Sequence, residues 1–275
     1  MALPDDIDAI RREPDPIRQA QRASALQTVY QQRSTELGRL RRAAMERAHL
    51  EAGLSYTDVA KALGITKGRV TQLRSSAPPA HRAIFGKGPV TVSVPYRRAE
   101  GRAHPLVSAE DMEARRQAVT MLRSLSFVTA EQEILVDDRR LPDGDVLLIC
   151  GPKSSLVSQV LIDQDPVLDV LNDDGRWLIV RRDTGERFGS GSHDAVPAAE
   201  DLAYVSRRES DGRVITHVAG IHAVGSIGAV QHLDSQAAAL FAKSGYGSFS
   251  MILRSSYDGM KITSTGTVAG PFGWE

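Results

Sequence analysis

The sequence predicts an α/β protein, in which an all-α N-terminal domain precedes a larger domain built from alternating strands and helices. Three observations lead to this prediction. Residues 17–52 contain no proline and consist mostly of good helix formers. Pro78 and Pro79 then interrupt the helical pattern, because proline cannot continue a helix. Beyond them, apolar runs of strand length alternate with helix-like segments, a pattern typical of α/β domains.

Composition and charge narrow the possible functions. The 275 residues suffice for two domains, and 41% hydrophobic with 25% charged residues is ordinary for a folded protein. The net charge of zero conceals an asymmetry, because residues 16–74 carry eleven Arg or Lys against four Asp or Glu. A basic segment beside a mildly acidic body is typical of a protein in which one domain contacts a phosphate backbone. We therefore expect double-stranded DNA as a partner.

The expected location is the cytoplasm. The single cysteine, Cys150, cannot form a disulfide within the chain, and no apolar run reaches the length of a membrane span. The first residues are acidic and lack the charged and then apolar pattern of an export signal. Residues 1–15 combine acids with Pro4 and Pro14, which favours a flexible leader.

The helical segment that follows carries an apolar stripe, because its apolar residues recur at spacings of three and four. The stripe has two possible partners: the core of the same small domain, or the seam of a homodimer. Periodicity does not distinguish between them, but regulators that read two half-sites usually need a dimer, and we expect one. The residues of the stripe are Leu26, Val29, Tyr30, Leu37, Leu40, Ala44 and Ala48.

The stretch from Tyr56 to Arg74 has the spacing of two short helices joined by a tight turn. Ala60 would lie where the helices cross, and Gly64 would take the left-handed backbone of the turn. Four apolar residues would lock the pair together: Val59, Leu63, Val70 and Leu73. The outward residues would be groups that contact phosphates and base edges, namely Thr66, Lys67, Arg69, Thr71, Gln72 and Arg74.

This pattern resembles the helix-turn-helix of bacterial repressors and of sigma-factor region 4, over about 20 residues. The resemblance implies a DNA-binding domain over residues 16–77, followed by a linker over 78–88. Arg69 or Gln72 would read bases, and the serine and threonine hydroxyls at the helix starts would bind phosphate. A solvated helical hairpin is the alternative interpretation. The full set of predicted DNA contacts is Ser55, Thr57, Thr66, Lys67, Arg69, Thr71, Gln72 and Arg74.

Residues 89–275 predict a Rossmann-like, mostly parallel sheet with a β-hairpin insertion over 175–189. Ligands of such sheets bind beyond the carboxyl ends of the strands. Three strand ends carry small polar or charged residues that suit a small anionic or nucleotide-like ligand, although tight turns with serine caps would use the same residues. The candidates are Tyr96 and Arg97; Gly151, Lys153, Ser154 and Ser155; and Gly220, His222, Gly225 and Ser226.

Other chemistry is not indicated. His217, His222 and His232 lack the spacing of a zinc site, no cofactor motif is recognisable, and Cys150 at a strand end is most simply a small core residue. The sequence therefore predicts a transcription regulator with an α/β ligand-sensing domain and no catalytic residues. A nucleotide-processing enzyme that uses the helix-turn-helix for localisation is the main alternative. A DNA-binding module that recruits protein partners is the third.

Overall fold

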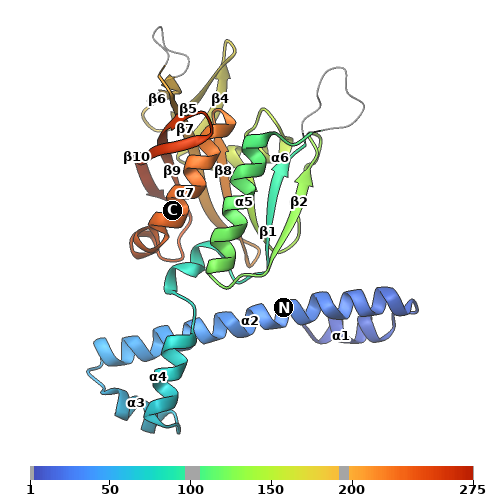
Figure 1. The fold of residues 1–275 in the computed structure, drawn as a ribbon, viewed down its shortest axis with the longest axis vertical. Helices are drawn as coiled ribbons and strands as arrows, with labels where there is room; N and C mark the ends of the chain where they lie inside the picture. Colours follow the sequence, from blue (N-terminus) through green and yellow to red (C-terminus); the bar gives the residue numbers. More distant parts are fainter. Residues whose placement is uncertain (1–2, 97–105, 192–197, 275) are drawn as a thin grey trace.

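The computed structural model describes residues 3–96, 106–191 and 198–274. It contains an elongated helical region and a mixed α/β domain (Figure 1). The long helix α2 runs beneath the α/β domain, and the chain continues from α4 into that domain. The predicted division into an N-terminal helical part and a C-terminal sheet domain is therefore confirmed.

The N-terminal residues form a helical hairpin. Helix α1 (Leu3–Arg11) folds back against α2 (Pro16–Leu50), a single helix of 35 residues. Asp15 caps α2, since its Oδ1 accepts a hydrogen bond of 2.8 Å from the Ile17 amide. Where a flexible leader was expected over residues 1–15, residues 3–11 form a helix, because Ile7 and Ile10, three residues apart, lie on the side that faces α2.

Two short helices, α3 (Tyr56–Ala62) and α4 (Lys67–Ser76), pack against the C-terminal end of α2. Gly64 lies in the turn between them with a φ of 66°, the left-handed conformation predicted for it. The prediction that Leu63 packs between the helices is wrong, because the chain leaves α3 at Leu63 and its side chain is 49% exposed. Met45 of α2 completes a small core with Val59, Ala60, Val70 and Leu73.

The predicted linker over residues 78–88 is largely part of the α/β domain. Residues Ala80–Phe85 form a 3₁₀ helix, η1, in which Ile84 and Phe85 belong to the core of that domain. Arg82 in the same turn is also fully buried. The linker prediction fails because Pro78 and Pro79 end α4 without separating the domains, and an apolar turn follows them directly.

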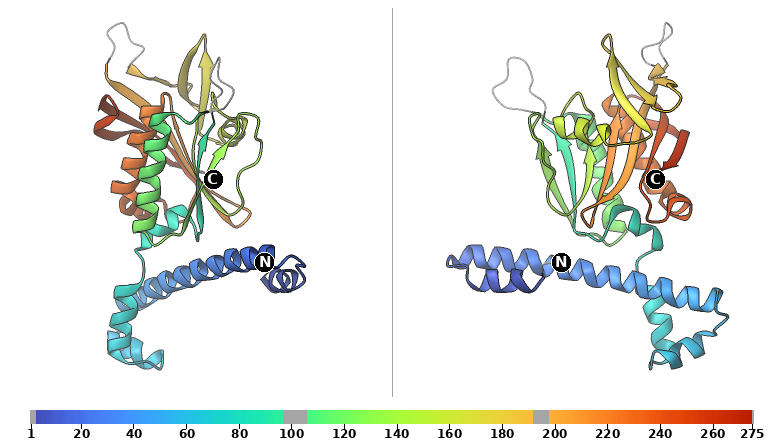
Figure 2. Two further views of the ribbon diagram at one scale, coloured as in Figure 1. Left: turned by 45° about the vertical axis from the view of Figure 1, so that its right-hand side comes forward. Right: turned by 180° about the vertical axis from the view of Figure 1, so that it is seen from behind.

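The large sheet is mostly parallel in the direction of its strands: five run one way, and β7 and β10 run the other (Figures 1 and 2). Adjacent strands pair in parallel from β2 to β8 and antiparallel from β8 to β10. In spatial order the seven strands are β10 (Lys261–Gly273), β9 (Phe249–Asp258), β7 (Glu200–Ser210), β8 (Arg213–Gly220), β3 (Asp145–Ile149), β1 (Val90–Pro95) and β2 (Thr129–Ile134).

The antiparallel part was not predicted, although the sequence contains its signal. Asp211-Gly212 joins β7 to β8 with φ of 54° and 73°, as a two-residue hairpin turn requires. A second two-residue turn, Gly259-Met260, joins β9 to β10, with Gly259 at a φ of 59°. Each turn reverses the chain between neighbouring strands and makes them antiparallel.

Both faces of the sheet are covered (Figure 2). Helices α5 (Ala109–Ser124) and α7 (Ala223–Ser244) lie side by side on one face, where Leu147 and Ile149 of β3 enter the largest core cluster. Helix α6 (Leu156–Asp163) covers the other face, where Val146 and Leu148 point. The opposite burial of alternate β3 residues explains its continuous apolar run.

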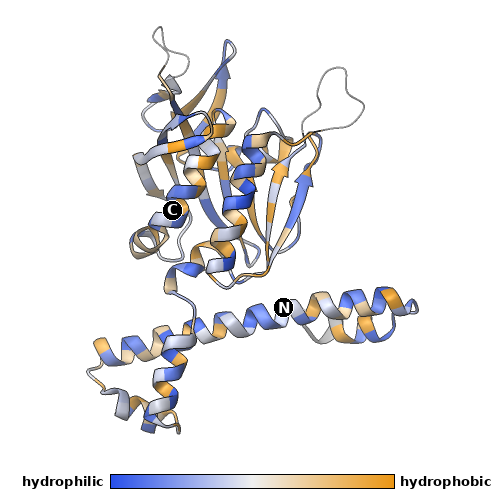
Figure 3. Cartoon of the chain, viewed as in Figure 1, coloured by the Kyte–Doolittle hydropathy of each residue, from blue (hydrophilic) through white to orange (hydrophobic). Residues whose placement is uncertain are grey.

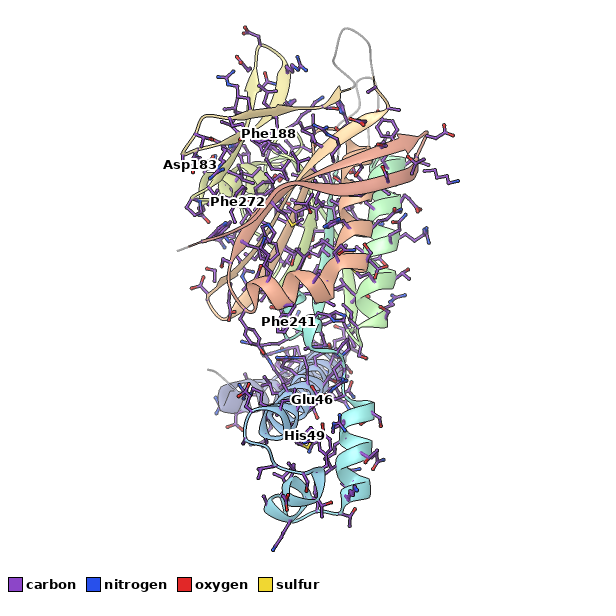
Figure 4. All side chains as sticks on the ribbon, turned by 90° about the vertical axis from the view of Figure 1, so that its left-hand side faces the viewer. Glu46, His49, Asp183, Phe188, Phe241 and Phe272 are labelled. Carbon is purple, nitrogen blue, oxygen red and sulfur yellow. The ribbon has the colours of Figure 1, made fainter. Side chains whose placement is uncertain are left out.

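A second, three-stranded sheet also packs on the α6 face. Its strands are β4 (Leu168–Asp173), β5 (Arg176–Arg181) and β6 (Arg187–Gly189), with β5 and β6 forming the predicted hairpin. Phe188 and Phe272 pack at its base against buried residues of the large sheet (Figure 4). This insertion brings Trp177 towards the carboxyl ends of the parallel strands, where the candidate site lies.

Candidate functional site

A cleft of about 260 Å³ lies at the carboxyl ends of the neighbouring parallel strands β3 and β8. The Cys150 amide donates to the Val218 carbonyl at 2.9 Å, so the loops after the two strands begin side by side. The cleft combines small, charged and aromatic residues from both loops, from α5 and from the second sheet. Its lining consists of Glu110, Asp111, Cys150, Gly151, Pro152, Lys153, Ser154, Val170, Trp177, Gly220, Ile221, His222, Ala223 and Ser226.

The structure brings together six of the ten predicted ligand residues: Gly151, Lys153, Ser154, Gly220, His222 and Ser226. Tyr96 does not line the cleft, because β1 lies on the far side of β3 from β8. Ser155 is buried as the cap of α6, where its Oγ accepts from the Val157 amide. Arg97 lies outside the described residues.

Gly225 also lies behind the cleft surface, where it contacts a carboxylate. Asp201 of β7 is fully buried, and its Oδ2 accepts hydrogen bonds from the amides of His222 (3.0 Å) and Gly225 (2.9 Å). A Cβ at Gly225 would lie 2.5 Å from that oxygen, so the position requires glycine. Gly225 therefore does not line the cleft, and its role is to let Asp201 hold the loop.

Asp201 also orients the one histidine of the cleft. Its Oδ1 lies 3.0 Å from His222 Nδ1, and this hydrogen bond raises the pKa of His222 above its ordinary value. A protonated imidazole is a cation and a hydrogen-bond donor, so the pair favours an anionic group in the cleft. Asp201 was missed by sequence reasoning, although an acid directly before the apolar run LAYV of a buried strand is itself an unusual signal.

Gly220 and Ser226 close the turn between β8 and α7. The Gly220 amide donates to Ser226 Oγ at 3.0 Å, and a Cβ at Gly220 would collide with the His222 carbonyl oxygen. The turn geometry therefore accounts for the glycine. The hydroxyl of Ser226 accepts in this bond, which leaves its hydrogen able to donate towards the cleft.

The cleft has both basic and acidic sides. Lys153 and His222 come from the two strand-end loops, whereas Glu110 and Asp111 stand in the first turn of α5. Ser108 caps this helix and bonds Asp111, with its Oγ 2.8 Å from Asp111 Oδ2. Trp177 adds an aromatic wall. Glu110, Asp111 and Trp177 were not predicted to line the cleft, because they come from elements distant in sequence from the two loops.

A buried hydrogen-bond cluster supports the β3 end of the cleft. The Cys150 carbonyl accepts from Ser158 Oγ (2.8 Å) and from His217 Nε2 (2.7 Å). Burial lowers the pKa of His217 to about 4, so its ring is neutral at neutral pH. Cys150 itself is buried and packs in a core cluster, consistent with the expected core role.

The predicted DNA-contacting residues gather on α4 and on the first turn of α3. Lys67, Arg69, Thr71 and Gln72 are all exposed, and Arg69 Nη1 donates to Gln72 Oε1 at 2.6 Å. Thr66 is exposed and caps α4, with its Oγ1 accepting from the Arg69 amide at 3.1 Å. Helix α4 therefore presents a guanidinium group and an amide group side by side, and its N-terminus is capped.

Three of these residues have other roles or positions. Ser55 forms a capping box with Asp58, to which its Oγ donates at 2.6 Å. Thr57 is exposed on the same turn. Arg74 was predicted to face outward but is half-buried, with its guanidinium carbon 4.0 Å from the centre of the Tyr56 ring. Its cation–π contact stabilises the pairing of α3 with α4.

Comparison with protein-family models and with curated proteins finds no match for this chain. Within the described residues, no helix has both the length and the apolar character needed to cross a membrane. Function must therefore be inferred from the two sites themselves.

Proposed function

We propose that the protein is a cytoplasmic, DNA-binding transcription regulator whose α/β domain senses a small anionic or nucleotide-like ligand. The observation that carries the proposal is the exposed basic and amide surface of α4, presented by a compact helix pair in the basic part of the chain. The turn at Gly64 and the packing of α3 on α4 support the helix-turn-helix interpretation.

In this proposal α4 enters the major groove. Arg69 and Gln72 would exchange their mutual hydrogen bond for base edges, guanine for the guanidinium and adenine for the amide. Lys67, Thr57 and Thr71 would contact phosphates. Ser55 has a smaller part, because its hydroxyl is held by a carboxylate that would repel a phosphate.

The cleft would hold the ligand. Four parallel strands with polar loops at their carboxyl ends resemble the arrangement that Rossmann-like sheets use for ligands, and we propose the same use here. Lys153 and His222 would bind an anionic group, and Trp177 would pack on an apolar or aromatic part. The volume of about 260 Å³ suits a mononucleotide-sized or smaller molecule better than a dinucleotide.

Helix α2 connects the α/β domain to the helix pair α3 and α4. Arg82 of the α/β domain bonds Gln32 and Glu36 of α2, and Arg39 of α2 bonds Tyr246. Fewer than two turns further along, Met45 of α2 packs in the core of α3 and α4. A ligand that favours one position of α2 would therefore change the position of α4.

The DNA assignment is tested by selecting duplexes from a random library with the purified chain and titrating the enriched sequence at fixed salt. Arg69→Ala should weaken specific binding by about 1–3 kcal/mol and relax the preference at one base pair. Arg123→Ala, an exposed arginine of the α/β domain, serves as the control. Unchanged affinity in Arg69→Ala would refute the role of α4.

The ligand assignment is tested by thermal unfolding with pools of mononucleotides and other small anions. A ligand at a hundred times its dissociation constant should add ~2.7 kcal/mol of stability, and Lys153→Ala should abolish the shift. If no pool shifts the transition, the third interpretation, a module that recruits proteins, is favoured instead.

One observation favours the enzymatic alternative. The Asp201–His222 pair has the geometry of an orienting carboxylate and an imidazole in a cleft, which acid–base catalysis uses. A nucleotide-processing enzyme would turn over common nucleotides, and His222→Gln would abolish turnover while leaving DNA binding unchanged. Absence of turnover with wild-type protein would reject this alternative.

A further inference from the structure

Helix α2 contacts the α/β domain with its polar face. Gln32 and Arg39 are buried there, and Gln32 Nε2 donates to the Ser126 carbonyl at 3.3 Å. The apolar stripe faces elsewhere: Leu37 is 65% exposed and Leu40 is 44% exposed. Two partners were considered for this stripe, the core of the same domain and a second copy of the chain. The described residues of the chain itself leave most of the stripe uncovered. A long helix that buries its polar face and exposes its apolar one needs another partner.

An open apolar groove lies between α1 and α2, at the N-terminal end of this stripe. Figure 3 shows hydrophobic residues, in orange, on both of these helices. Its volume is about 460 Å³, and its lining is mainly apolar. The lining residues are Ile7, Ile10, Ala23, Leu26, Gln27, Tyr30, Gln31 and Ser34. The groove and the two exposed leucines are therefore on the same helix, about four turns apart.

When one surface carries both a groove and a projecting pair of side chains, two copies related by a two-fold axis can each insert the pair into the groove of the other. In an antiparallel pair, Leu37 and Leu40 of each copy would enter the groove of the other. The midpoint of the leucines is near residue 38, and the midpoint of Ala23 and Leu26 is near residue 24, so the axis would pass near residue 31. This register also places Arg33 of one copy against the Tyr30 ring of the other, a cation–π contact.

Charge supports the same pairing. Residues 3–30, the two helices that form the groove, contain five Asp or Glu against four Arg, a net charge of 5 − 4 = 1 negative. Residues 33–47, which carry the leucines, contain five Arg against two Glu, a net charge of 5 − 2 = 3 positive. The antiparallel arrangement therefore brings a weakly acidic segment of each copy to a basic segment of the other, twice.

We propose that the groove between α1 and α2 is the docking site of a second copy of this chain, which inserts Leu37 and Leu40 in an antiparallel, two-fold arrangement. The docking surface itself requires no DNA. One consequence rests on the proposed function: Met45, where α4 packs, lies about 14 residues from the axis, so the two DNA-binding units would be roughly 40 Å apart. This is close to the ~34–36 Å between half-sites one turn apart.

Sedimentation of the full chain without DNA tests the proposal. We expect a dimer in the wild type, and Leu37→Glu should raise the dissociation constant by about 100-fold or more, because symmetry places the buried charge at two sites. Leu50→Glu is the matched control, since Leu50 is an 80% exposed leucine on the same helix outside the groove. Its dimer should be unchanged. The exposure of Leu37 means that its substitution should not affect folding, which circular dichroism would check.

A wild-type chain that stays monomeric at high micromolar concentration would overturn the proposal, even if Leu37→Glu weakens binding to some other protein. A dimer that is equally stable in both variants would also overturn it, because the copies would then meet elsewhere. The register is tested by cross-linking: a bis-maleimide should join Leu26→Cys,Leu37→Cys chains into dimers, whereas Leu50→Cys chains should remain monomers. Since these measurements omit DNA, they can fail or succeed independently of the proposed function.

Discussion

The α/β domain and the helical region use their apolar residues in opposite ways. In the α/β domain, alternate residues of β3 enter cores on both faces of the sheet, and both faces are covered by helices or strands. In the helical region, the core around Met45 contains five buried residues, while Leu37, Leu40 and Leu50 remain exposed. The difference teaches that the α/β domain has large apolar cores on both faces of its sheet, whereas the helical region has a small core and leaves three leucines of one helix exposed.

Glycines show the same contrast. In the α/β domain a Cβ at Gly228 would collide with Ser255 Oγ, because α7 approaches β9 closely at that point. In the helical region nothing lies within 4 Å of a Cβ added at Gly38, Gly53 or Gly64. Close packing against glycine is therefore found at particular positions of the α/β domain, whereas other glycines there, such as Gly212, lie in open turns as Gly53 and Gly64 do.

The junction between the two regions should show the largest effect. Arg82 is fully buried, bonds Gln32, Glu36 and the Leu125 carbonyl, and stacks on the Phe127 ring at 3.7 Å. Arg82→Ala removes one hydrogen bond from each of these groups, although Glu36 keeps its bonds from Arg39, and should cost about 3–5 kcal/mol. Urea unfolding measures the loss, with exposed Arg41→Ala as the control. Equal stability of the two variants would mean that the regions are not held together by this arginine.

Acid should destabilise the α/β domain through His217. Because its folded pKa is lowered to about 4, the unfolded chain binds a proton near pH 6.5 while the folded chain does not. This contribution is intact above pH 6.5 and is lost as the pH falls to 4, at a cost of roughly 3 kcal/mol. Unfolding midpoints between pH 7 and pH 4 measure it, and His217→Asn should flatten that part of the profile. An unchanged slope in the variant would exclude His217 as the cause.

Substituting alanine for glycine should change stability in opposite directions at two positions, Gly228 and Gly68. Gly228→Ala should destabilise the protein by about 1–3 kcal/mol through overpacking against β9. Gly68→Ala should stabilise α4 by up to about 1 kcal/mol, because the nearest atom, Thr66 Oγ1, would lie 3.9 Å from the new Cβ. Thermal unfolding of both variants checks the pair. Destabilisation by Gly68→Ala would show that the helical region is packed more tightly than its surface indicates.

The smallest effect concerns Ser55. As the cap of α3, Ser55→Ala should cost about 1 kcal/mol of stability and change DNA affinity little. Thr57→Ala should do the reverse, with little loss of stability and weaker binding, because Thr57 is exposed on the same turn. Parallel unfolding and DNA titrations separate the roles, and a large affinity loss in Ser55→Ala would restore it as a phosphate contact.

Local patterns predicted most elements, and tertiary proximity accounts for most failures. The loops at Gly151 and Gly220 were brought together as predicted, because parallel neighbours end at one edge. Strand β2, TAEQEI, escaped notice because a polar edge strand has little apolar alternation. Trp177 and Asp111 could not be assigned to the cleft, because no local pattern tells which distant elements meet there. The Asp211-Gly212 turn shows that part of the antiparallel topology could be predicted from the sequence.

Hydrogen exchange of the full chain, with and without a selected DNA duplex, tests most directly whether the helical region is the part that meets DNA. We expect added protection in peptides covering residues 55–76, centred on α4, while the large sheet keeps the protection that it has in the free protein. Added protection confined to residues 106–274, with none over 55–76, would contradict a DNA-binding role for the helical region.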